Sequence, residues 1–386
     1  MSGLFITAFN PVSAAELVEN IWNTKKPMTQ ARAGLGVIAV DGKIYAIGGS
    51  KDDLENAMFN TYKSGHVGTN ECYDPVSNTW STLEPMPTPR SNFAITAYQG
   101  KIYCIGGIIG WTTLDYWPFQ RFIMCDAVEV YDTVSGAWST KTFMPEDIKP
   151  FNTVDISACV VGGKIFVILQ YQLFMYDPDA DTWTKRAQLP LSHGYYDSFY
   201  EPVSVVVDGK LVVTSAIPDP DFRGTLFYDP KVDVWSKSEI RCRIPYFGDA
   251  GVTTGLYAPK KIYVLGMLNE YGDNRVYDPL NDSWSDGKSM LTPRLGFGVA
   301  VVDDVLYAIG GRTENQAASA VNEQYIPIGY KGVIPTPEPS NSLTTSESGS
   351  SKHPSAYLIV TILTVIIVKV VTGLFLYFKK RKISGV

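Results

Sequence analysis

Histidine is scarce in this sequence, and its scarcity narrows the chemistry that the protein could perform. The 386 residues contain three His, which are His66, His193 and His353. Copper and zinc sites in enzymes usually draw on several imidazole ligands. The five Cys show no Cys-x-x-Cys spacing of the kind that zinc and thiol-redox sites use. We therefore predict no metal and no cofactor, and the pairing of the Cys, if any, stays open.

Basic charge is also in short supply. Lys and Arg number 33 against 39 Asp and Glu, which gives a net charge of −6. A nucleic-acid-binding protein usually presents a basic surface, so no nucleic-acid partner is expected. No Gly-rich phosphate loop opens a helix, and no Gly-x-Ser-x-Gly motif occurs. We assign no catalytic residue and predict that the protein is not an enzyme.

What the sequence does contain is a phrase that recurs five times. Each copy begins with Tyr-Asp, and a Trp stands seven residues after the Tyr. The five Tyr are Tyr73, Tyr131, Tyr176, Tyr228 and Tyr277. Successive Trp lie 58, 45, 52 and 49 residues apart between Trp80 and Trp284. A constant spacing inside the phrase with variable spacing between phrases indicates a structural repeat joined by loops of unequal length.

Each repeat is expected to form four short strands. In the first repeat, two runs rich in Val, Ile and Tyr flank Asp41-Gly42, a dipeptide that suits a tight hairpin. Asp74 and Pro75 favour a turn at the end of the third strand. Trp80 on the fourth strand provides a large surface for packing between neighbouring sheets. Four strands per repeat, stacked around an axis, make one blade of a β-propeller.

These repeats resemble the Kelch repeat over residues 22–325. The resemblance rests on the phrase Ile-Tyr-x-Ile-Gly-Gly at residues 44–49 and 102–107, its variant at 306–311, the Tyr-Asp-Pro…Trp phrase and Met-Pro-x-x-Arg. The sequence departs from the family pattern in the middle, where the double Gly is replaced at residues 169–170, 214–215 and 266–267. The resemblance implies an all-β fold built from propeller blades.

Six blades are expected, with the two ends of the repeat region sharing one of them. The second-strand phrase occurs six times, centred on Tyr45, Tyr103, Phe166, Val212, Tyr263 and Tyr307. The last repeat reaches Tyr325 without a following Trp, whereas Trp22 precedes the first repeat. We predict that the N-terminal segment supplies the outer strand of the sixth blade. A closed ring has no free sheet edge at which other chains could pair.

The regions outside the propeller differ from it in composition. Residues 1–15 read as a truncated signal peptide or as a disordered lead-in, and both interpretations stay open. The propeller occupies residues 16–330, and a stalk rich in Pro, Ser and Thr follows at 331–355. Residues 356–378 are long and apolar enough for one transmembrane helix. Since 379–386 are basic, we expect a cytoplasmic tail and an extracellular propeller at the cell membrane.

The connections of a four-stranded blade alternate between the two faces of the disc. On one face we expect only short turns of the Asp-Gly kind or the turn between Tyr-Asp-Pro and Trp. The other, which we call the irregular face, collects the long connections at residues 50–69, 108–126, 140–152, 186–201 and 236–249. Insertions that gather on one face often mark a binding surface.

Aromatic and basic side chains are concentrated in these connections. The candidate ligand-binding residues of the loops are Trp111, Tyr116, Trp117, Tyr195, Tyr196, Tyr200, Arg243 and Tyr246. The alternative is that the aromatic side chains pack the loops onto the disc. Three further candidates stand where first strands begin, and they are Arg32, Arg90 and Arg294. In Kelch proteins that bind acidic peptides, arginines around this mouth contact the ligand, so the resemblance implies that role here. The alternative is that they hold loop carbonyls.

The function predicted from these features is recognition. We expect a cell-surface recognition or scaffolding module that binds a protein or glycan ligand through the irregular face. The alternative is an enzyme resembling the sugar mutarotases or glycosidases, with its site at the central mouth of the propeller. The sequence makes no prediction of the oligomeric state.

Overall fold

The computed structural model describes residues 19–51, 65–113, 120–145, 156–169, 172–190, 203–214, 225–238, 240, 246–267 and 271–333. These residues form strands β1 to β28 and no helix. They belong to a compact unit over Met1–Pro337, and a second unit, Glu338–Val386, lies outside them. The described part therefore holds no helix able to cross a membrane. The predicted segments 1–15, 356–378 and 379–386 all fall outside it.

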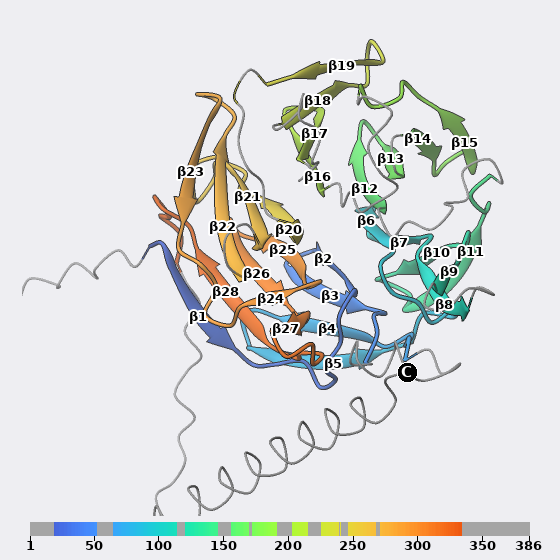
Figure 1. Ribbon diagram of the computed structural model, residues 1–386, viewed down its shortest axis with the longest axis horizontal. Coiled ribbons are helices and arrows are strands. Elements are labelled where there is room, and N and C mark those ends of the chain that lie inside the picture. The colour runs from blue at the N-terminus through green and yellow to red at the C-terminus, as the bar shows by residue number, and fades with distance from the viewer. Residues whose placement is uncertain are drawn as a thin grey trace, which may run out of the picture. The chain divides into compact units, whose positions relative to one another are not determined.

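Six four-stranded antiparallel sheets stand around a common axis, as Figure 1 shows. Blade 1 consists of β2 (Gly36–Val40), β3 (Lys43–Ile47), β4 (Asn70–Asp74) and β5 (Thr79–Leu83). Blade 2 consists of β6 (Ala94–Tyr98), β7 (Lys101–Ile105), β10 (Val128–Asp132) and β11 (Ala137–Lys141). Blade 3 consists of β12 (Ile156–Val161), β13 (Lys164–Leu169), β14 (Gln172–Asp177) and β15 (Thr182–Lys185).

The remaining blades follow the same order from the axis outward. Blade 4 consists of β16 (Val203–Val207), β17 (Lys210–Thr214), β18 (Thr225–Asp229) and β19 (Val234–Lys237). Blade 5 consists of β20 (Tyr246–Val252), β21 (Ile262–Met267), β22 (Tyr271–Asp278) and β23 (Ser283–Gly287). Blade 6 consists of β25 (Gly298–Val302), β26 (Val305–Ile309), β28 (Asn322–Ile326) and β1 (Ile21–Lys25).

Blade 6 confirms the predicted closure of the ring. The N-terminal strand β1 pairs antiparallel with β28, and Trp22 stands opposite Tyr325 with the two ring centres 5.0 Å apart. The indole Nε1 of Trp22 also donates to the carbonyl of Lys288, at 2.7 Å, in the segment that follows blade 5. The strand thus completes one blade and fastens it to its neighbour.

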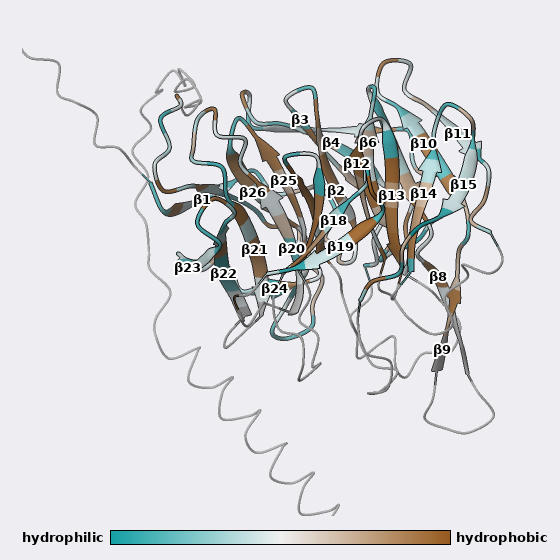
Figure 2. Ribbon diagram, turned by 90° about the horizontal axis from the view of Figure 1, so that it is seen from above, coloured by the Kyte–Doolittle hydropathy of each residue, from teal (hydrophilic) through white to brown (hydrophobic). Residues whose placement is uncertain are grey.

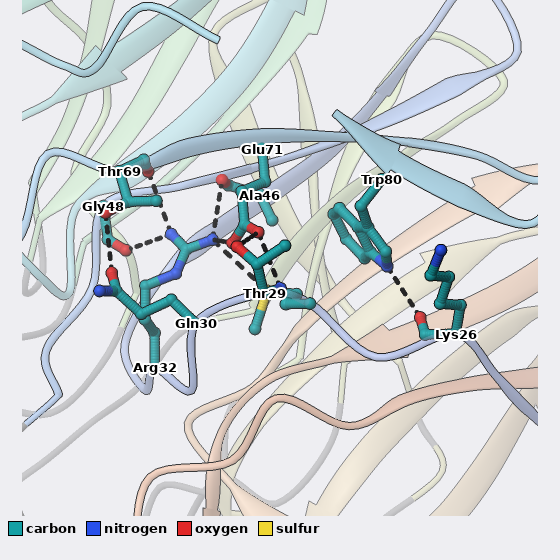
Figure 3. Close-up of polar contacts among 10 residues, drawn as sticks. Lys26, Thr29, Gln30, Arg32, Ala46, Gly48, Thr69, Glu71 and Trp80 are labelled. Carbon is teal, nitrogen blue, oxygen red and sulfur yellow. Dashed lines mark hydrogen bonds and ion pairs between the residues drawn. The ribbon is translucent and has the colours of Figure 1, made fainter. Parts of the chain in front are cut away.

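The constant spacing of seven residues between Tyr and Trp has a physical cause. In blade 1 the Tyr73 hydroxyl donates to Oδ1 of Asn78, at 2.8 Å, and that oxygen also accepts the backbone N–H of Lys26 at 2.9 Å. Asn78 adopts a left-handed backbone with φ of 53°. Two residues later, Nε1 of Trp80 donates to the Lys26 carbonyl at 2.8 Å (Figure 3). Tyr, Asn and Trp therefore bind blade 1 to the segment after the outer strand of blade 6.

The same link recurs around the ring. Trp138 donates to the carbonyl of Glu84 at 2.8 Å, and Trp235 donates to that of Ala187 at 2.8 Å. The hydrophobic core likewise lies between blades, because buried residues of neighbouring sheets share each cluster. The four Cys in the described part, Cys72, Cys104, Cys125 and Cys159, are buried and free, and Cys242 lies outside it.

One connection contradicts the expectation of short, uniform turns on the face opposite the irregular one. In blade 5, nine residues at 253–261 separate β20 from β21. The Asp304 carboxylate from blade 6 holds this loop by accepting the backbone N–H groups of Thr254, Tyr257 and Ala258 at 2.5, 2.7 and 3.0 Å. At its tip Leu256 is 75% exposed. The sequence Ala258-Pro-Lys-Lys261 carries no tight-turn signal, and for that reason the prediction was wrong here.

Candidate functional site

The six first strands line a central channel. Its cavity measures about 530 Å³, and residues of β2, β6, β12, β16, β20 and β25 surround it. Since each of these strands pairs on one side only, its other backbone edge faces the channel. The lining side chains are mostly small or apolar, with hydroxyl groups from Thr96, Ser157 and Ser204.

Near the irregular face, the strand register places one residue of each first strand in a common layer. Each member stands opposite the equivalent position of the second strand, and the six are Gly36, Ala94, Ser157, Val203, Asp249 and Gly298. Two are glycines and two others are small. Asp249 is the one charged side chain among the residues that line the channel in the described structure.

The rim of this mouth is ordered over blades 6, 1 and 2. The N–H of Gly34 donates to the carbonyl of Gly296 at 2.8 Å, and the N–H of Asn92 donates to the carbonyl of Gly34 at 2.7 Å. All three residues have positive φ, of 60 to 62° for the glycines and 51° for Asn92. Gly and Asn accept this left-handed backbone at low cost. The result is a continuous arc of backbone hydrogen bonds across three blades.

Behind this arc, Arg32 is fully buried rather than exposed to a ligand. Its exposed fraction is 0%, and its guanidinium forms an ion pair of 2.6 Å with Glu71. Figure 3 shows the same group donating to the carbonyls of Gly48, at 2.6 Å, and Ala46, at 3.2 Å. Burial lowers the pKa of the Arg32 guanidinium, and the Glu71 carboxylate acts in the opposite direction.

The other two predicted arginines have the same surroundings. Arg90 pairs with Glu129 at 2.6 Å and donates to the Cys104 carbonyl at 3.0 Å. Arg294 pairs with Glu323 at 2.7 Å, and it also donates to the carbonyls of Ala308 and Gly310 at 2.7 and 2.8 Å. Both are 0% exposed. A ligand at the mouth does not reach these guanidinium groups in this structure, which agrees with the alternative that they hold loop carbonyls.

The arginines precede a set of antiparallel bridges on the irregular face, two of which extend into two-stranded ribbons. In each case, the residue after the Arg bridges to the residue after the double Gly. The bridges are Ala33–Ser50, Ser91–Ile108 and Leu295–Arg312. In blade 2 the ribbon continues as β8 (Ile108–Thr113) paired with β9 (Gln120–Met124), which extends beyond the disc in Figure 2. In blade 6 it forms β24 (Arg294–Leu295) and β27 (Arg312–Thr313).

The structure describes the other predicted site residues only in part. Trp111 lies in β8, opposite Phe122 of β9, and Tyr246 begins β20 opposite Met267. Their side chains are outside the described part. The remaining candidates lie wholly outside the described residues, and they are Tyr116, Trp117, Tyr195, Tyr196, Tyr200 and Arg243.

Sequence reasoning missed the partners of the arginines. Glu71, Glu129 and Glu323 each stand two residues before the Tyr of the repeat phrase. The corresponding positions in blades 3, 4 and 5 are Phe174, Leu226 and Arg275. A Glu occurs only in the repeats whose first strand follows an Arg. The occurrence of this Arg and this Glu in the same three repeats could have predicted a buried ion pair.

It also missed Asp249. A β-bulge in β20 shifts the register between Tyr246 and Asp249. A side chain at Gly248 would place its Cβ 1.6 Å from the carbonyl oxygen of Leu265, so only Gly fits. The Asp249 carboxylate accepts the N–H of Ala250 at 2.8 Å and that of Val299 in blade 6 at 2.7 Å. Burial raises its pKa to about 6.

Comparison with known proteins agrees with this architecture. The Kelch motif model matches residues 31–87, 89–116 and 293–328. The chain is a Kelch-repeat propeller. The matched segments contain blade 1, the first two strands of blade 2, and β25, β26 and β28 of blade 6, together with Arg32, Arg90 and Arg294. Residues that could hold a metal ion do not cluster within the described part of this Kelch propeller.

Several curated Kelch proteins resemble part of the chain. Kelch-like protein 35 of Mus musculus is 29% identical over 173 residues, or 44% of this chain and 26% of that protein. Kelch-like protein 36 of Mus musculus is 31% identical over 141 residues, or 36% of this chain and 20% of that protein. The propeller thus matches about a quarter or less of these relatives' length. The solved structure of YjhT superimposes with a TM-score of 0.55 at 13% identity, covering 77% of this chain and 95% of that one, and it shows the fold alone.

Proposed function

We propose that this Kelch propeller is a non-catalytic recognition module that binds a protein or glycan ligand through its irregular face. The observation that carries the proposal is the asymmetry between the two faces. In the described structure, the irregular face carries two ribbons outside the blades, β8–β9 and β24–β27, and an isolated bridge between Ala33 and Ser50, and each begins beside a buried arginine. Rigid anchoring lowers the entropy that a binding surface loses when it meets a ligand.

The β8–β9 hairpin is the longest ribbon among the described residues of this surface. It carries Trp111 directly opposite Phe122, and Ile123 on the same hairpin is 43% exposed. Aromatic and aliphatic side chains on a projecting element are common anchors of protein and glycan recognition. In the sequence, Tyr116 and Trp117, the other aromatic candidates of this connection, stand between the two strands, outside the described residues.

Binding is favoured over the alternative of a sugar mutarotase or glycosidase at the central mouth. Glycosidases work with a pair of carboxyl groups about 5 to 9.5 Å apart. The described lining of the channel offers one carboxyl group, that of Asp249. Glu71, Glu129 and Glu323 are buried and paired with arginine.

We further propose that residues 356–378 anchor the protein in the cell membrane with the propeller outside. The support comes from the sequence, because an apolar span of membrane length precedes Lys379-Lys-Arg-Lys382. A tether of this kind raises the local concentration of the propeller and so supports multivalent contacts with surface ligands. Protease added to intact cells should then release the propeller. Complete protection of the propeller from the protease would contradict the proposed orientation.

The recognition proposal is tested with the full chain in lipid nanodiscs, applied to a glycan array and to intact cells. Trp111→Ala and Ile123→Glu alter the hairpin of blade 2. Val134→Glu is the matched control, because Val134 is 92% exposed in the turn between β10 and β11 of the same blade, on the opposite face. We expect the two hairpin variants to lose most of the binding and the control to retain it. Equal binding by all three would remove the irregular face as the site.

A further inference from the structure

The central channel has the size and lining of a small-molecule site. Its volume of about 530 Å³ lies within the roughly 300–1,000 Å³ usual for such sites. Its walls are largely Val, Ile, Ala and Gly, with a few hydroxyl groups. A chamber of this kind suits a compact apolar body, and a few polar groups would then fix its orientation.

The channel contains one ionisable group that can carry charge near neutral pH. Among its described lining residues, the titratable side chains are those of Asp249 and Cys159. Burial raises the pKa of the Cys159 thiol to about 12, so the thiol stays neutral. The groups that interact with the Asp249 carboxylate in the described structure are two backbone N–H groups, and none of them is a cation.

The fold positions this carboxylate in a defined place. The bulge at Gly248 sets its backbone, and the N–H groups of Ala250 and Val299 each bind one of its oxygens. An ionised carboxylate has about four acceptor sites, so roughly two remain for a ligand. The neighbouring layer position in blade 6 is Gly298, which places no side chain beside the carboxylate.

Among the described residues, no basic side chain interacts with this carboxylate. Arg32, Arg90 and Arg294, which precede the first strands of three blades, are each paired with their own buried Glu. The described channel therefore presents a carboxylate without a cationic partner. Removing such a charge from water is costly, and a cation that enters the channel would offset that cost.

We propose that the channel binds a small organic cation, with the apolar body of the ligand inside the channel and its ammonium group against the Asp249 carboxylate. This site is separate from the ribbons of the irregular face, and a ligand here acts independently of macromolecular recognition. The charge of the ligand provides selectivity, and the volume of the channel limits its size.

The experiment compares two probes of nearly equal shape on the full chain in detergent. Benzylammonium carries the cation, and benzyl alcohol is its neutral counterpart. We expect calorimetry at pH 7.5 to show at least tenfold tighter binding of benzylammonium. At pH 5 the preference should shrink about tenfold, since protonation of Asp249 removes the charge. This comparison uses the unaltered protein and so does not depend on whether a variant folds.

Three variants sharpen the result. Asp249→Asn should abolish the preference for benzylammonium while leaving the weak binding of benzyl alcohol. Asp208→Asn is the matched control, because the Asp208 side chain is 71% exposed in the turn after β16, and it should change neither probe. Trp111→Ala should also leave both unchanged, which separates this site from the recognition face.

Three outcomes would overturn the proposal. The first is equal binding of the charged and neutral probes, and the second is a preference that survives Asp249→Asn. The third is the absence of benzylammonium binding at millimolar concentrations, which would show that the channel is closed to cations of this size.

Discussion

Blades 6, 1 and 2 differ from blades 3, 4 and 5 in the way each fastens its second strand to its third. In the first group a buried Arg binds the carbonyls of the second strand and a Glu of the third. In blades 3 and 4 the Glu position holds Phe174 and Leu226, which are largely buried among apolar neighbours. We call the first group the arginine half and the second the apolar half, in which two of the three positions are apolar and blade 5 has Arg275. Both form complete four-stranded blades.

The comparison shows that the ion pairs are not required to form a blade. Replacing a buried ion pair with apolar residues of similar volume is often neutral for stability, whereas removal of one partner is severe. Among the described residues, the arginine half has a backbone hydrogen-bond arc along its rim and bridges or ribbons on the irregular face. The pairs thus lie beneath that surface, whereas blades 3 and 4 form with an apolar residue at the same position.

The largest effect should come from breaking one pair. Arg90→Ala leaves the Glu129 carboxylate buried without its cation, at a cost of about 3–5 kcal/mol in the free energy of unfolding. Chemical denaturation monitored by Trp fluorescence measures the loss. The double variant Arg90→Leu/Glu129→Leu imitates the apolar half and should recover most of it. A double variant as unstable as the single one would contradict our account of the two halves.

Trp22→Ala should weaken the ring where it closes. Trp22 is 5% exposed, packs on Tyr325 and donates to the Lys288 carbonyl. Truncation of a buried Trp costs roughly 3 kcal/mol or more. Trp183 of blade 3 is only partly buried, so Trp183→Ala should cost less in the same denaturation experiment. A larger loss of unfolding free energy for Trp183→Ala than for Trp22→Ala would contradict the expectation that the closing strand contributes more to stability.

The pH dependence of stability should have opposite signs at two acids of neighbouring blades. Burial raises the pKa of Asp249 in blade 5 from 3.8 to about 6. A carboxyl whose pKa is raised by folding favours the folded state only while protonated. Its contribution therefore falls as pH rises from about 4 to about 6 and is constant above. Denaturation of Asp249→Asn across this range should lack that slope.

Asp304 of blade 6 provides the contrasting case. Its burial would raise the pKa, but the three N–H groups of loop 253–261 lower it below the usual value. Its contribution is therefore present above pH 4 or so and is lost as pH falls through the lowered pKa. Asp304→Asn should destabilise the protein at neutral pH and flatten the acid limb of its stability curve. An unchanged acid limb would show that the carboxylate does not hold the loop.

The smallest effect should appear at the hydroxyl of the repeat phrase. Tyr228→Phe in blade 4 removes a hydrogen bond of 2.6 Å to Asp233, at a cost of about 1 kcal/mol. In blade 2 the residue five positions after Tyr131 is Gly136, which has no side chain to accept the bond. Tyr131→Phe should therefore cost less than Tyr228→Phe. Equal losses in denaturation would mean that the hydroxyl bond contributes little in either half.

The sequence predicted those parts of the fold that depend on local chemistry. The links made by Tyr73, Asn78 and Trp80 arise within one turn and its flanking strands, so their spacing is constant and visible. Counting the same phrases also located β1, because Trp22 was the Trp that the sixth repeat lacked. Local signals of this kind identify blades even where the double Gly is absent.

Features that depend on distant partners were not predictable in the same way. Whether Arg32 faces a ligand or the interior is decided by Glu71, which lies 39 residues away and meets it only after the blade has formed. The place of Asp249 depends on a bulge, which shifts the alternation of a strand by one residue. The loop at 253–261 gains its order from Asp304, about 50 residues later.

The closing strand has a consequence for how the chain is made. Residues 21–25 leave the ribosome before every other strand of the propeller, yet their partner, residues 322–326, emerges nearly last. At about 5–20 residues per second, synthesis of the roughly 300 residues between them takes on the order of 15 to 60 s. For that time the first strand has no partner within its own chain. Newly synthesised chains in the same cell therefore have a β1 strand without its β28 partner. Exchange of β1 between two such chains is the misassembly that this topology favours.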